Sequence, residues 1–309
     1  MAALRLYQHS FRAMGCQVNI WLETEANGDA VLQPIPEQFE GYEDILSRFR
    51  PDSELSQLNR RAGQWVKVSP ILLENLHAAR QAARLTEGLY NPLILEALIA
   101  VGYDRPFAQM QTQPEIKWTL EAVHIPKWDQ FEVDLTKQMV RVPANSQVDL
   151  GGIAKGWAAE MIANQLSKWG ACLVDVGGDL VARGRAWDVT VAEAGDAEDV
   201  PALVNLKIAN ASVITTGIDY RHWIVNGRTQ HHIIDPRTGQ PADTDVLTVT
   251  IIHPHAPTAE AFAKAVFLLG SDAGLEWLHH QWHGAGLVTR TDGTVLASSR
   301  FLQHLTTSV

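Results

Sequence analysis

Six short segments rich in β-branched residues follow one another between residues 172 and 252, and they most constrain the fold of this chain. In order, they read CLVDVG, AWDVTVA, LVNLKIA, ASVITT, RHWIV and VLTVTII. Segments of this length and composition, separated by turn residues, are typical of β-strands. Helical patterns flank the run without the regular strand–helix alternation that builds a parallel sheet. The sequence therefore predicts an α+β fold with mostly antiparallel sheets and packed helices.

The clearest helix lies in SPILLENLHAARQAARLTEG, residues 69–88. Ser69 is a favourable N-cap, Pro70 fits the first turn, and Gly88 fits the C-terminal end. A second strong helix, in GGIAKGWAAEMIANQLSKWG at residues 151–170, is preceded by glycines and closed by another. Weaker helical patterns are found at residues 37–47, 258–268 and 272–281.

The other strand signals lie outside the central run. FRAMGCQVNIWLE, residues 11–23, alternates and is predicted to form the opening strand. QFEVDLTKQMVRV reads as a hairpin that turns near Lys137 and Gln138, and a last hairpin is expected over residues 286–297. Residues 103–120, which are polar and contain two prolines, read as a loop or an insertion.

Composition excludes several classes of function. The chain has 309 residues and a formal net charge of −10, with no long basic run, which argues against a nucleic-acid-binding groove. It has no run of about 18 apolar residues, so no membrane insertion is expected. The stretch before Cys16 lacks the apolar core of a signal peptide, and two cysteines, Cys16 and Cys172, are too few for a disulfide framework. A chain of this length forms one large domain or two small ones, and the cytoplasm is the predicted compartment.

The stretch VDLGGIAKGWAAE places a double glycine between a strand that ends at Asp149 and a helix that carries Lys155 in its first turn. Gly151 and Gly152 let backbone N–H groups approach an anion closely, and a helix N-terminus adds favourable partial charge. Lys155 can reach a phosphate from this position. The pattern matches neither a Walker A loop nor GxGxxG, so a tight turn and a phosphate site both remain open.

A second double glycine, in LVDVGGDL at residues 173–180, reads as a hairpin turn. Farther along, TTGIDYRHW is followed by HHIIDPRTGQP, whose Asp-Pro and Thr-Gly pairs are turn chemistry. His231 and His232 lie on a strand-like segment, so only one is expected to face inward, either as a satisfied core residue or as a catalytic group. Nearby arginines give this region a cationic character that suits an anionic ligand.

Two further stretches carry weaker signals. SRFRPDSELSQLNRR, residues 47–61, contains a Pro-Asp-Ser turn before a short helix and reads as a basic, solvated connector. TEGLYNPLILEALIAVGYDRPF, residues 86–107, breaks at Asn91 and Pro92 next to Tyr90, and most of it is expected to lie in the core.

Taken in order, these stretches resemble the family of FAD:protein FMN transferases, the ApbE family. The resemblance runs from about Phe11 to Gly270 and rests on MGC, SRFRPDSELSQLN, DLGGIAKG, VGGD, TTGIDYR, HHIIDPRTG and AEAFAKAVFLLG. It implies a single domain, residues 1–309, with a T-fold-like α+β architecture of two interleaved subdomains and FAD held in a cleft between them. It also implies a transferase that cleaves the FAD diphosphate, moves FMN onto a Thr or Ser hydroxyl of a target flavoprotein, and releases AMP. FAD and Mg²⁺ are the implied cofactors, and an acceptor flavoprotein is the implied partner.

The resemblance assigns roles to individual residues. Those implied to contact FAD are Met14, Tyr90, Asp149, Gly151, Gly152, Lys155, Thr215, Thr216, Gly217 and His232. Lys155 and His232 are the implied catalytic residues, because a lysine neutralises phosphate oxygens and a histidine near the reacting phosphate accepts a proton. Mg²⁺ would be bound by the carboxylate of Glu260 and by a backbone carbonyl near Ala154.

The chain departs from the family at the metal position, where the usual pattern is Ala-Asp-x-x-x-Thr. Glu260 keeps the charge of the Asp, but Lys264 stands in place of the Thr, and a protonated amine has no lone pair for a metal. In one interpretation both residues lie on a solvated helix face as an ordinary i,i+4 pair. In the other, both point inward and the ammonium group occupies the place of the metal. Cys16 for Thr and Asn91 for Asp are smaller departures.

FMN transfer is the predicted function. One alternative is an FAD-binding protein that has lost metal-dependent transfer, and another is an FAD diphosphate hydrolase in which water replaces the acceptor hydroxyl. A scaffold that keeps only the fold is a further alternative, because a fold does not settle a function. The sequence does not identify the acceptor protein or the oligomeric state.

Overall fold

The computed structural model describes residues 3–110, 123–195, 200–225 and 227–306. The chain divides into two compact units, each assembled from segments that are far apart in the sequence. The first unit holds Met1–Phe39, Lys155–Tyr220 and Thr244–Val309, and the second holds Glu40–Ala154 and Arg221–Asp243.

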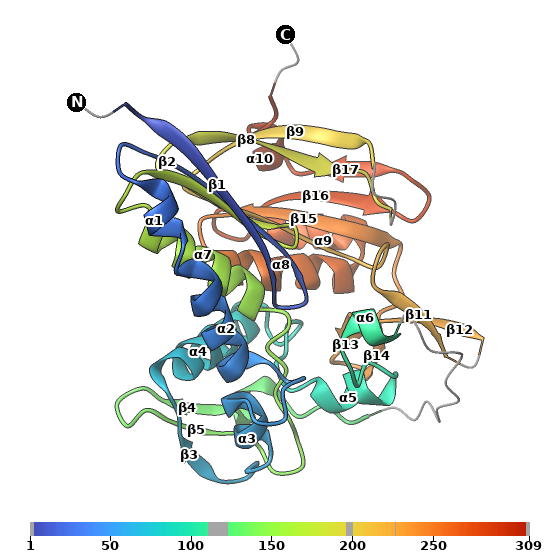
Figure 1. Cartoon of the computed structure of the whole chain (residues 1–309). Coiled ribbons are helices and arrows are strands. Elements are labelled where there is room, and N and C mark those ends of the chain that lie inside the picture. The colour runs from blue at the N-terminus through green and yellow to red at the C-terminus, as the bar shows by residue number, and fades with distance from the viewer. Residues whose placement is uncertain (1–2, 111–122, 196–199, 226, 307–309) are drawn as a thin grey trace. The chain divides into compact units, whose positions relative to one another are not determined.

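The first unit is built on one eight-stranded sheet (Figure 1), in the order β1-β2-β6-β7-β10-β15-β16-β17. Every neighbouring pair in this sheet is antiparallel, as the sequence predicts. The strands are β1 (Arg5–Ala13), β2 (Cys16–Thr24), β6 (Ala171–Val176), β7 (Asp179–Arg183), β10 (Ser212–Gly217), β15 (Val246–His253), β16 (Ala285–Arg290) and β17 (Val295–Ala297).

The predicted opening strand is wrong in one respect, because residues 11–23 contain a turn. In the β1–β2 hairpin Ala13 pairs with Cys16, so Met14 and Gly15 are the two turn residues. Their φ angles are 51° and 71°, and a type I′ turn requires positive φ at both central positions. The Gly177–Gly178 turn between β6 and β7 has the same feature, with φ of 62° and 90°, which confirms the hairpin interpretation of VGGD.

Helices pack on one face of this sheet (Figure 1). They are α7 (Ala154–Leu166), α8 (Ala256–Leu269) and α9 (Ser271–His279), and α8 lies against β10 and β15. Ten of the fourteen residues of α8 are buried, so this helix has almost no solvated face. The short helices α1 (Gly28–Leu32) and α10 (Ser299–Leu302) complete the unit, and α2 (Ile35–Leu46) runs on from it into the second unit.

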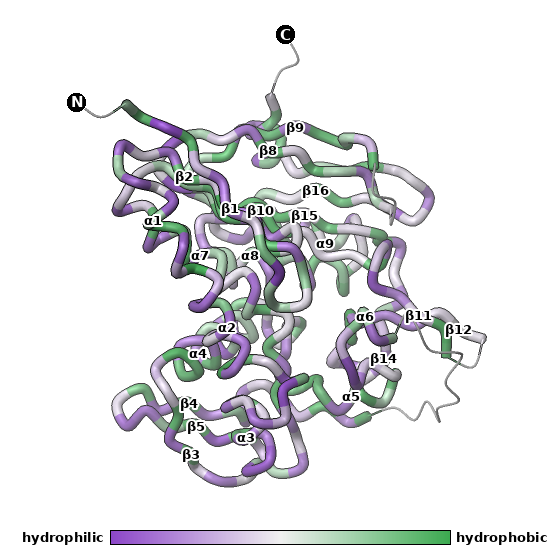
Figure 2. The backbone as a smooth tube through the Cα atoms, viewed as in Figure 1, coloured by the Kyte–Doolittle hydropathy of each residue, from purple (hydrophilic) through white to green (hydrophobic). Residues whose placement is uncertain are grey.

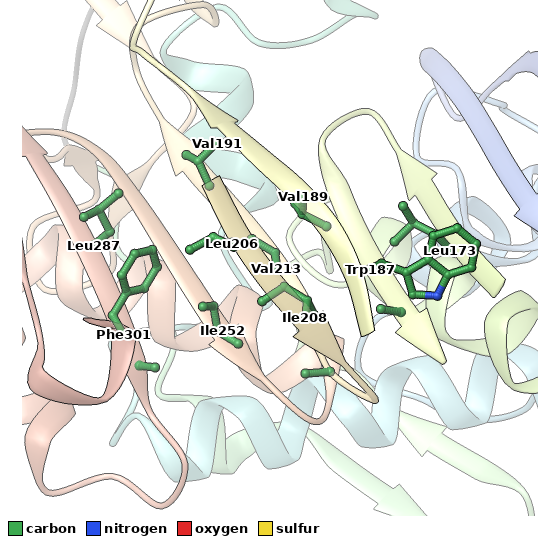
Figure 3. Close-up of a cluster of buried hydrophobic side chains, with 13 residues drawn as sticks. Leu173, Trp187, Val189, Val191, Leu206, Ile208, Val213, Ile252, Leu287 and Phe301 are labelled. Carbon is green, nitrogen blue, oxygen red and sulfur yellow. The ribbon is translucent and has the colours of Figure 1, made fainter. Parts of the chain in front are cut away.

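A hairpin formed by β8 (Ala186–Ala192) and β9 (Ala202–Ala209) packs on the opposite face of the sheet. Buried and exposed residues alternate along β8, whose place on the backbone tube is labelled in Figure 2. Figure 3 shows the buried side chains of the hairpin against those of the sheet and of α10. The labelled members of this cluster are Leu173, Trp187, Val189, Val191, Leu206, Ile208, Val213, Ile252, Leu287 and Phe301. Burial of each large apolar side chain stabilises the fold by about 1.5–3 kcal/mol.

The second unit consists of short elements. Its helices are α3 (Glu54–Asn59), α4 (Pro70–Leu85), α5 (Leu95–Ala100), α6 (Phe107–Met110) and the 3₁₀ helix η1 (Trp128–Gln130). Three small sheets, of orders β3-β5-β4, β11-β12 and β13-β14, complete it. The strands are β3 (Trp65–Lys67), β4 (Glu132–Asp134), β5 (Met139–Arg141), β11 (His222–Val225), β12 (Arg228–His231), β13 (Ile234–Asp235) and β14 (Gln240–Pro241).

Local signals predicted α4 and the β4–β5 hairpin correctly. The Ser69 hydroxyl accepts a hydrogen bond from the backbone N–H of Leu72, Pro70 opens the helix, and Gly88 has a φ of 86° just after its end. α6 lies within the predicted loop 103–120, whose remaining residues from 111 onward lie outside the described residues. Among the helices that the structure describes, none is both long and apolar enough to cross a bilayer.

Candidate functional site

Four charged side chains of the first unit form one cluster. Lys155 lies in the first turn of α7, and Asp179 begins β7 directly after the Gly177–Gly178 turn. Glu260 and Lys264 lie one turn apart on α8. Three of the predicted motifs, DLGGIAKG, VGGD and AEAFAKAVFLLG, therefore each contribute charged residues to one place in the fold.

The four side chains are paired and largely buried. Lys264 Nζ donates to Glu260 Oε2 at 2.7 Å, and Lys155 Nζ forms an ion pair with Asp179 Oδ2. The carboxylates of Asp179 and Glu260 are only 2% and 4% exposed, and the two lysine side chains are 16% and 17% exposed. The interpretation of Glu260 and Lys264 as a solvated surface pair is therefore wrong, and both residues point inward.

Each carboxylate interacts with both lysines. Burial raises the pKa of Asp179, and the Glu260 charge adds to this effect, whereas Lys155 and Lys264 oppose it. Burial also acts to raise the pKa of Glu260, but the attraction of Lys264 and Lys155, together with the backbone N–H of Gly156, outweighs it and lowers this pKa. The four groups thus behave as one network in which two positive charges balance two negative ones.

Gly156 allows α7 and α8 to approach each other at this cluster. A Cβ atom at Gly156 would lie 3.2 Å from Glu260 Cγ and 3.3 Å from Ala256 Cβ, which is tighter than an ordinary contact. The glycine of the AKG sequence is therefore needed for close packing of the helices, which places the carboxylate of Glu260 next to the first turn of α7.

The cluster does not have the chemistry of a Mg²⁺ site. Mg²⁺ requires oxygen ligands in octahedral geometry, whereas an ammonium group offers donors only. Oε2 of Glu260 already has the ammonium of Lys264 as its partner, and Oε1, which is buried without a hydrogen-bond partner among the described residues, is a single oxygen and not a set of metal ligands. Within the described parts of the chain, no three His, Cys, Asp or Glu side chains lie together in an arrangement that could hold a metal ion. Ala154, the other predicted ligand, is the first residue of α7 and belongs to the second unit.

The three residues predicted from TTG do not share one environment. Thr216 is buried on the face of β10 that carries the helices, whereas Thr215 is exposed on the opposite face and hydrogen-bonds the Thr250 hydroxyl at 2.9 Å. The alternation of side chains along a strand separates them. A Cβ atom at Gly217 would lie within 3.0 Å of Asp219, Thr248 and the Leu247 carbonyl, so only glycine fits there.

Thr215 lines a cavity of about 660 Å³ between the β8–β9 hairpin and the sheet. Its walls include the apolar side chains of Trp21, Leu173, Leu180, Trp187 and Val213. Its described lining contains four carboxylates and no lysine, arginine or histidine; the carboxylates are Asp175, Asp188, Glu193 and Asp219. This charge makes the cavity unsuitable for a diphosphate.

In the second unit, Asp149 organises the double-glycine loop. Its Oδ1 accepts a hydrogen bond from the Gly151 N–H at 2.9 Å, and its Oδ2 pairs with Arg48 Nε at 2.8 Å. Its own N–H donates to the Pro92 carbonyl at 2.8 Å. The tight-turn interpretation of DLGG is thus supported by geometry, and Asp149, predicted to contact FAD, has both of its carboxylate oxygens engaged within the protein.

Arg48 is the residue that sequence reasoning missed. Its side chain is 7% exposed, and its guanidinium lies 4.0 Å from the ring centroid of Phe49 and 4.6 Å from that of Tyr103. The prediction of a solvated connector is therefore wrong here, although it holds for Arg50, which forms ion pairs with three acidic residues. The Arg-Phe pair that follows a predicted helix is only a weak signal of a buried cation. The stacking of the guanidinium on two aromatic rings also depends on Tyr103, which is distant in the sequence.

The two histidines differ as expected. His231 is buried, and its Nε2 lies 2.9 Å from the Ala242 carbonyl while its Nδ1 accepts from the Ile233 N–H, so it is a satisfied core residue. Burial lowers the pKa of His231. His232 is only partly buried, and its ring lies edge-on to Tyr103 with centroids 6.4 Å apart.

The remaining predicted residues have structural surroundings of their own. Tyr90 is 4% exposed, and the Asn91 amide donates to the Pro126 carbonyl and accepts from the Leu93 N–H. Met14 lies in the β1–β2 turn, and a Cβ atom at Gly177 would lie 2.7 Å from Cys16 Cβ. The MGC and VGGD motifs are therefore two hairpin turns that pack against each other.

Comparisons with known proteins agree with this architecture. The model of the ApbE family matches residues 14–288 of the chain. The FAD:protein FMN transferase of Treponema pallidum (strain Nichols) is 31% identical over 293 residues, which cover 87% of this chain and 80% of that protein. The structure of the ApbE protein from Thermotoga maritima, 24% identical, matches 98% of this chain and 100% of that chain with a TM-score of 0.84. The flavin transferase ApbE from Vibrio cholerae, 22% identical, matches 98% and 100% with a TM-score of 0.81. The match of the family model to most of the chain, on a fold that these structures share, shows that the chain belongs to the ApbE family.

Proposed function

We propose that this chain transfers FMN from FAD to a Thr or Ser hydroxyl of an acceptor flavoprotein and releases AMP. The hydroxyl oxygen bonds to the phosphorus of the FMN half, the bond from that phosphorus to the AMP oxygen breaks, and the hydroxyl proton is finally carried by AMP or solvent. The Treponema pallidum relative bears the name of this activity. The observation that carries the proposal is the pair of fixed ammonium groups, Lys155 and Lys264, in one buried cluster.

Diphosphate cleavage depends mainly on neutralising charge and positioning the reacting groups. Lys155 follows the Gly151–Gly152 loop and is held in place by Asp179, so its ammonium is preorganised for a phosphate oxygen. His232, whose imidazole is partly buried beside Tyr103, is the proposed base that accepts the proton of the acceptor hydroxyl. Met14, Tyr90, Thr215, Thr216 and Gly217 remain predicted FAD contacts.

A second function is favoured by one observation. Lys264 stands where the family pattern has a metal ligand, and an ammonium carries one positive charge where Mg²⁺ carries two. An FAD-binding protein without transfer is the function expected if this difference abolishes cleavage. Both functions predict FAD binding, and only the first predicts AMP.

The test uses purified protein with FAD and a flavoprotein domain that the Vibrio cholerae flavin transferase modifies, with that enzyme as the positive control. Covalent flavin is read by in-gel fluorescence and intact mass, and AMP by chromatography. An acceptor that gains the mass of FMN less water, with an equal amount of AMP, supports transfer. Bound FAD without AMP supports the second function. AMP with free FMN in the absence of acceptor indicates hydrolysis and refutes transfer as the main activity.

A variant pair sharpens this test. Lys155→Gln shortens the side chain by one atom, keeps a polar end and removes the charge next to Asp179, so AMP formation is expected to fall by at least about tenfold. Lys207→Gln is the matched control, because Lys207 is 60% exposed and its ion pair with Asp188 is long, at 3.7 Å. Equal AMP formation by the two variants would show that Lys155 has no part in the reaction.

A further inference from the structure

In the charge cluster of Lys155, Asp179, Glu260 and Lys264, the cation that pairs with Glu260 is the ammonium group of Lys264. This cation is a side chain of the protein and not an ion taken up from solution. The Nζ of Lys264 lies 2.7 Å from Glu260 Oε2, a normal distance for a charge-assisted hydrogen bond. The two residues are four positions apart on α8, which is buried on most sides, so the rigid helix sets their spacing. A cation in this position is bound without any equilibrium with ions in solution.

The other groups of the cluster make the entry of a second cation unfavourable. Two lysines already balance the two carboxylates, and both carboxylates interact with both lysines. A divalent cation at Glu260 would displace Lys264 from its partner and would lie close to two ammonium groups in a buried place, where repulsion is weakly screened. The ion pair lost in this way would not be replaced by a new metal ligand, because the Lys264 ammonium has no lone pair to offer a metal ion.

The same cluster still offers what binding of a diphosphate requires, namely positive charge and hydrogen-bond donors. An ammonium group donates up to three hydrogen bonds, so Lys264 can bind Glu260 and a phosphate oxygen at once. The lysine side chains are 16% and 17% exposed, so solvent reaches them, whereas the carboxylates beneath them are almost fully buried. The lysine side chains are therefore the more accessible part of the network.

We infer that Lys264 replaces the divalent cation in this chain, so that its anion site binds the diphosphate of a dinucleotide such as FAD without a metal ion. The inference rests on the proposed function for its substrate, but it concerns the site itself. It predicts binding of ADP, the diphosphate part shared with FAD, to be unchanged by EDTA. It also predicts that Mn²⁺, a spectroscopic substitute for Mg²⁺, has no site at the cluster.

The first experiment uses the unmodified full chain. ADP affinity is measured by calorimetry with excess EDTA and with Mg²⁺, and Mn²⁺ binding is measured by electron paramagnetic resonance with and without ADP. Equal ADP affinity in both buffers, and no protein-bound Mn²⁺ beyond that held by ADP alone, support the inference. One Mn²⁺ per chain together with ADP binding that is lost in EDTA would overturn it.

The second experiment changes the cluster. The variant Glu260→Asp with Lys264→Thr supplies a carboxylate and a hydroxyl, so it is expected to bind Mn²⁺ and to make ADP binding dependent on it. Lys264→Gln, which keeps helix packing, is expected to weaken ADP binding about tenfold while riboflavin binding is unchanged, because only the diphosphate loses a charged donor. Lys207→Gln is the exposed control. ADP affinity of Lys264→Gln equal to that of the control would overturn the inference.

These readouts separate the inference from the proposed function. If ADP binds without a metal and Lys264→Gln weakens it, but no acceptor gains FMN, the cation replacement stands and the transferase proposal fails. If FMN transfer occurs and stops in EDTA, the transferase proposal stands and the cation replacement fails.

Discussion

Removal of the Lys264 charge is expected to destabilise the protein far more than loss of a surface ion pair would. Lys264→Met keeps most of the apolar length of the side chain but leaves the Glu260 carboxylate, which is 4% exposed, without its closest cation. Removal of one partner from a buried pair typically costs about 3–5 kcal/mol. Because Lys155 also attracts Glu260, we expect the lower end of this range, about 3 kcal/mol. An exposed i,i+4 pair would cost only about 0.3–0.5 kcal/mol.

A double-mutant cycle isolates this interaction. Glu260→Gln combined with Lys264→Met removes both charges, so its loss of stability is expected to be smaller than that of Lys264→Met alone, with a coupling energy of about 2 kcal/mol. Lys207→Met is the matched control, because Lys207 and its partner Asp188 are 60% and 77% exposed, and it is expected to change stability by less than about 0.5 kcal/mol.

The assay is urea unfolding followed by circular dichroism, with hydrogen exchange of peptides from α8 as a local readout. Hydrogen exchange is needed because the chain has two units, and a global transition need not be two-state. Hydrogen exchange in α8 is expected to be faster in Lys264→Met than in the parent chain and to slow again in the double variant. A loss below about 1 kcal/mol for Lys264→Met, with exchange in α8 like that of the control, would refute the argument that the pair is buried and coupled.

Three further predictions concern other parts of the molecule. Burial raises the pKa of the Cys172 thiol to about 12, so maleimide is expected to label only the partly exposed Cys16 in native protein; intact mass after brief labelling checks this, and two labels would contradict it. Burial lowers the pKa of His253 to about 4, with smaller effects from two neighbouring histidines. The unfolded state therefore binds a proton at a higher pH than the folded state, so the free energy of unfolding falls as the pH is lowered from 6.5 to 4. This fall is expected to be up to about 3 kcal/mol larger in the parent chain than in His253→Gln, as measured by urea unfolding at each pH. Gly239→Ala would place a Cβ atom 2.0 Å from the Val123 carbonyl oxygen at a φ of 71°, whereas the Cβ atom of Gly293→Ala, at a φ of 85°, meets nothing within 4 Å. Thermal unfolding is therefore expected to show a much larger loss of stability for Gly239→Ala than for Gly293→Ala. Equal losses would show that backbone strain alone determines the cost.

Short-range features of the sequence were sufficient for most elements. The N-cap Ser69 and the C-terminal Gly88 mark α4 because capping depends on residues within one turn of the helix end. The run of β segments after residue 170 predicts the antiparallel sheet for the same reason, since alternation and turns are local properties. The Met14–Gly15 turn was missed, although glycine after Met14 was a signal, because alternation continues on both sides of a two-residue turn.

The motifs of the candidate site were also readable in the sequence, but their surroundings were not. Thr215 and Thr216 are neighbours in the chain and lie on opposite faces of β10, so a prediction by motif grouped residues that the strand separates. Arg48 belongs to a stretch that looks solvated, and its burial depends on Asp149 and Tyr103, which follow it by 101 and 55 residues in the sequence, respectively.

The local sequence pattern alone places Glu260 and Lys264 one turn apart on a helix and puts Lys155 at the start of another helix after two glycines. The burial of these residues and Asp179 in one network emerges only from the folded arrangement. This is because α8 is apolar around most of its circumference, so hydrophobic periodicity along the chain does not indicate which side of the helix is covered. That choice depends on the close approach of α7 at Gly156 and on the packing of β10 and β15, which arises only when distant segments meet.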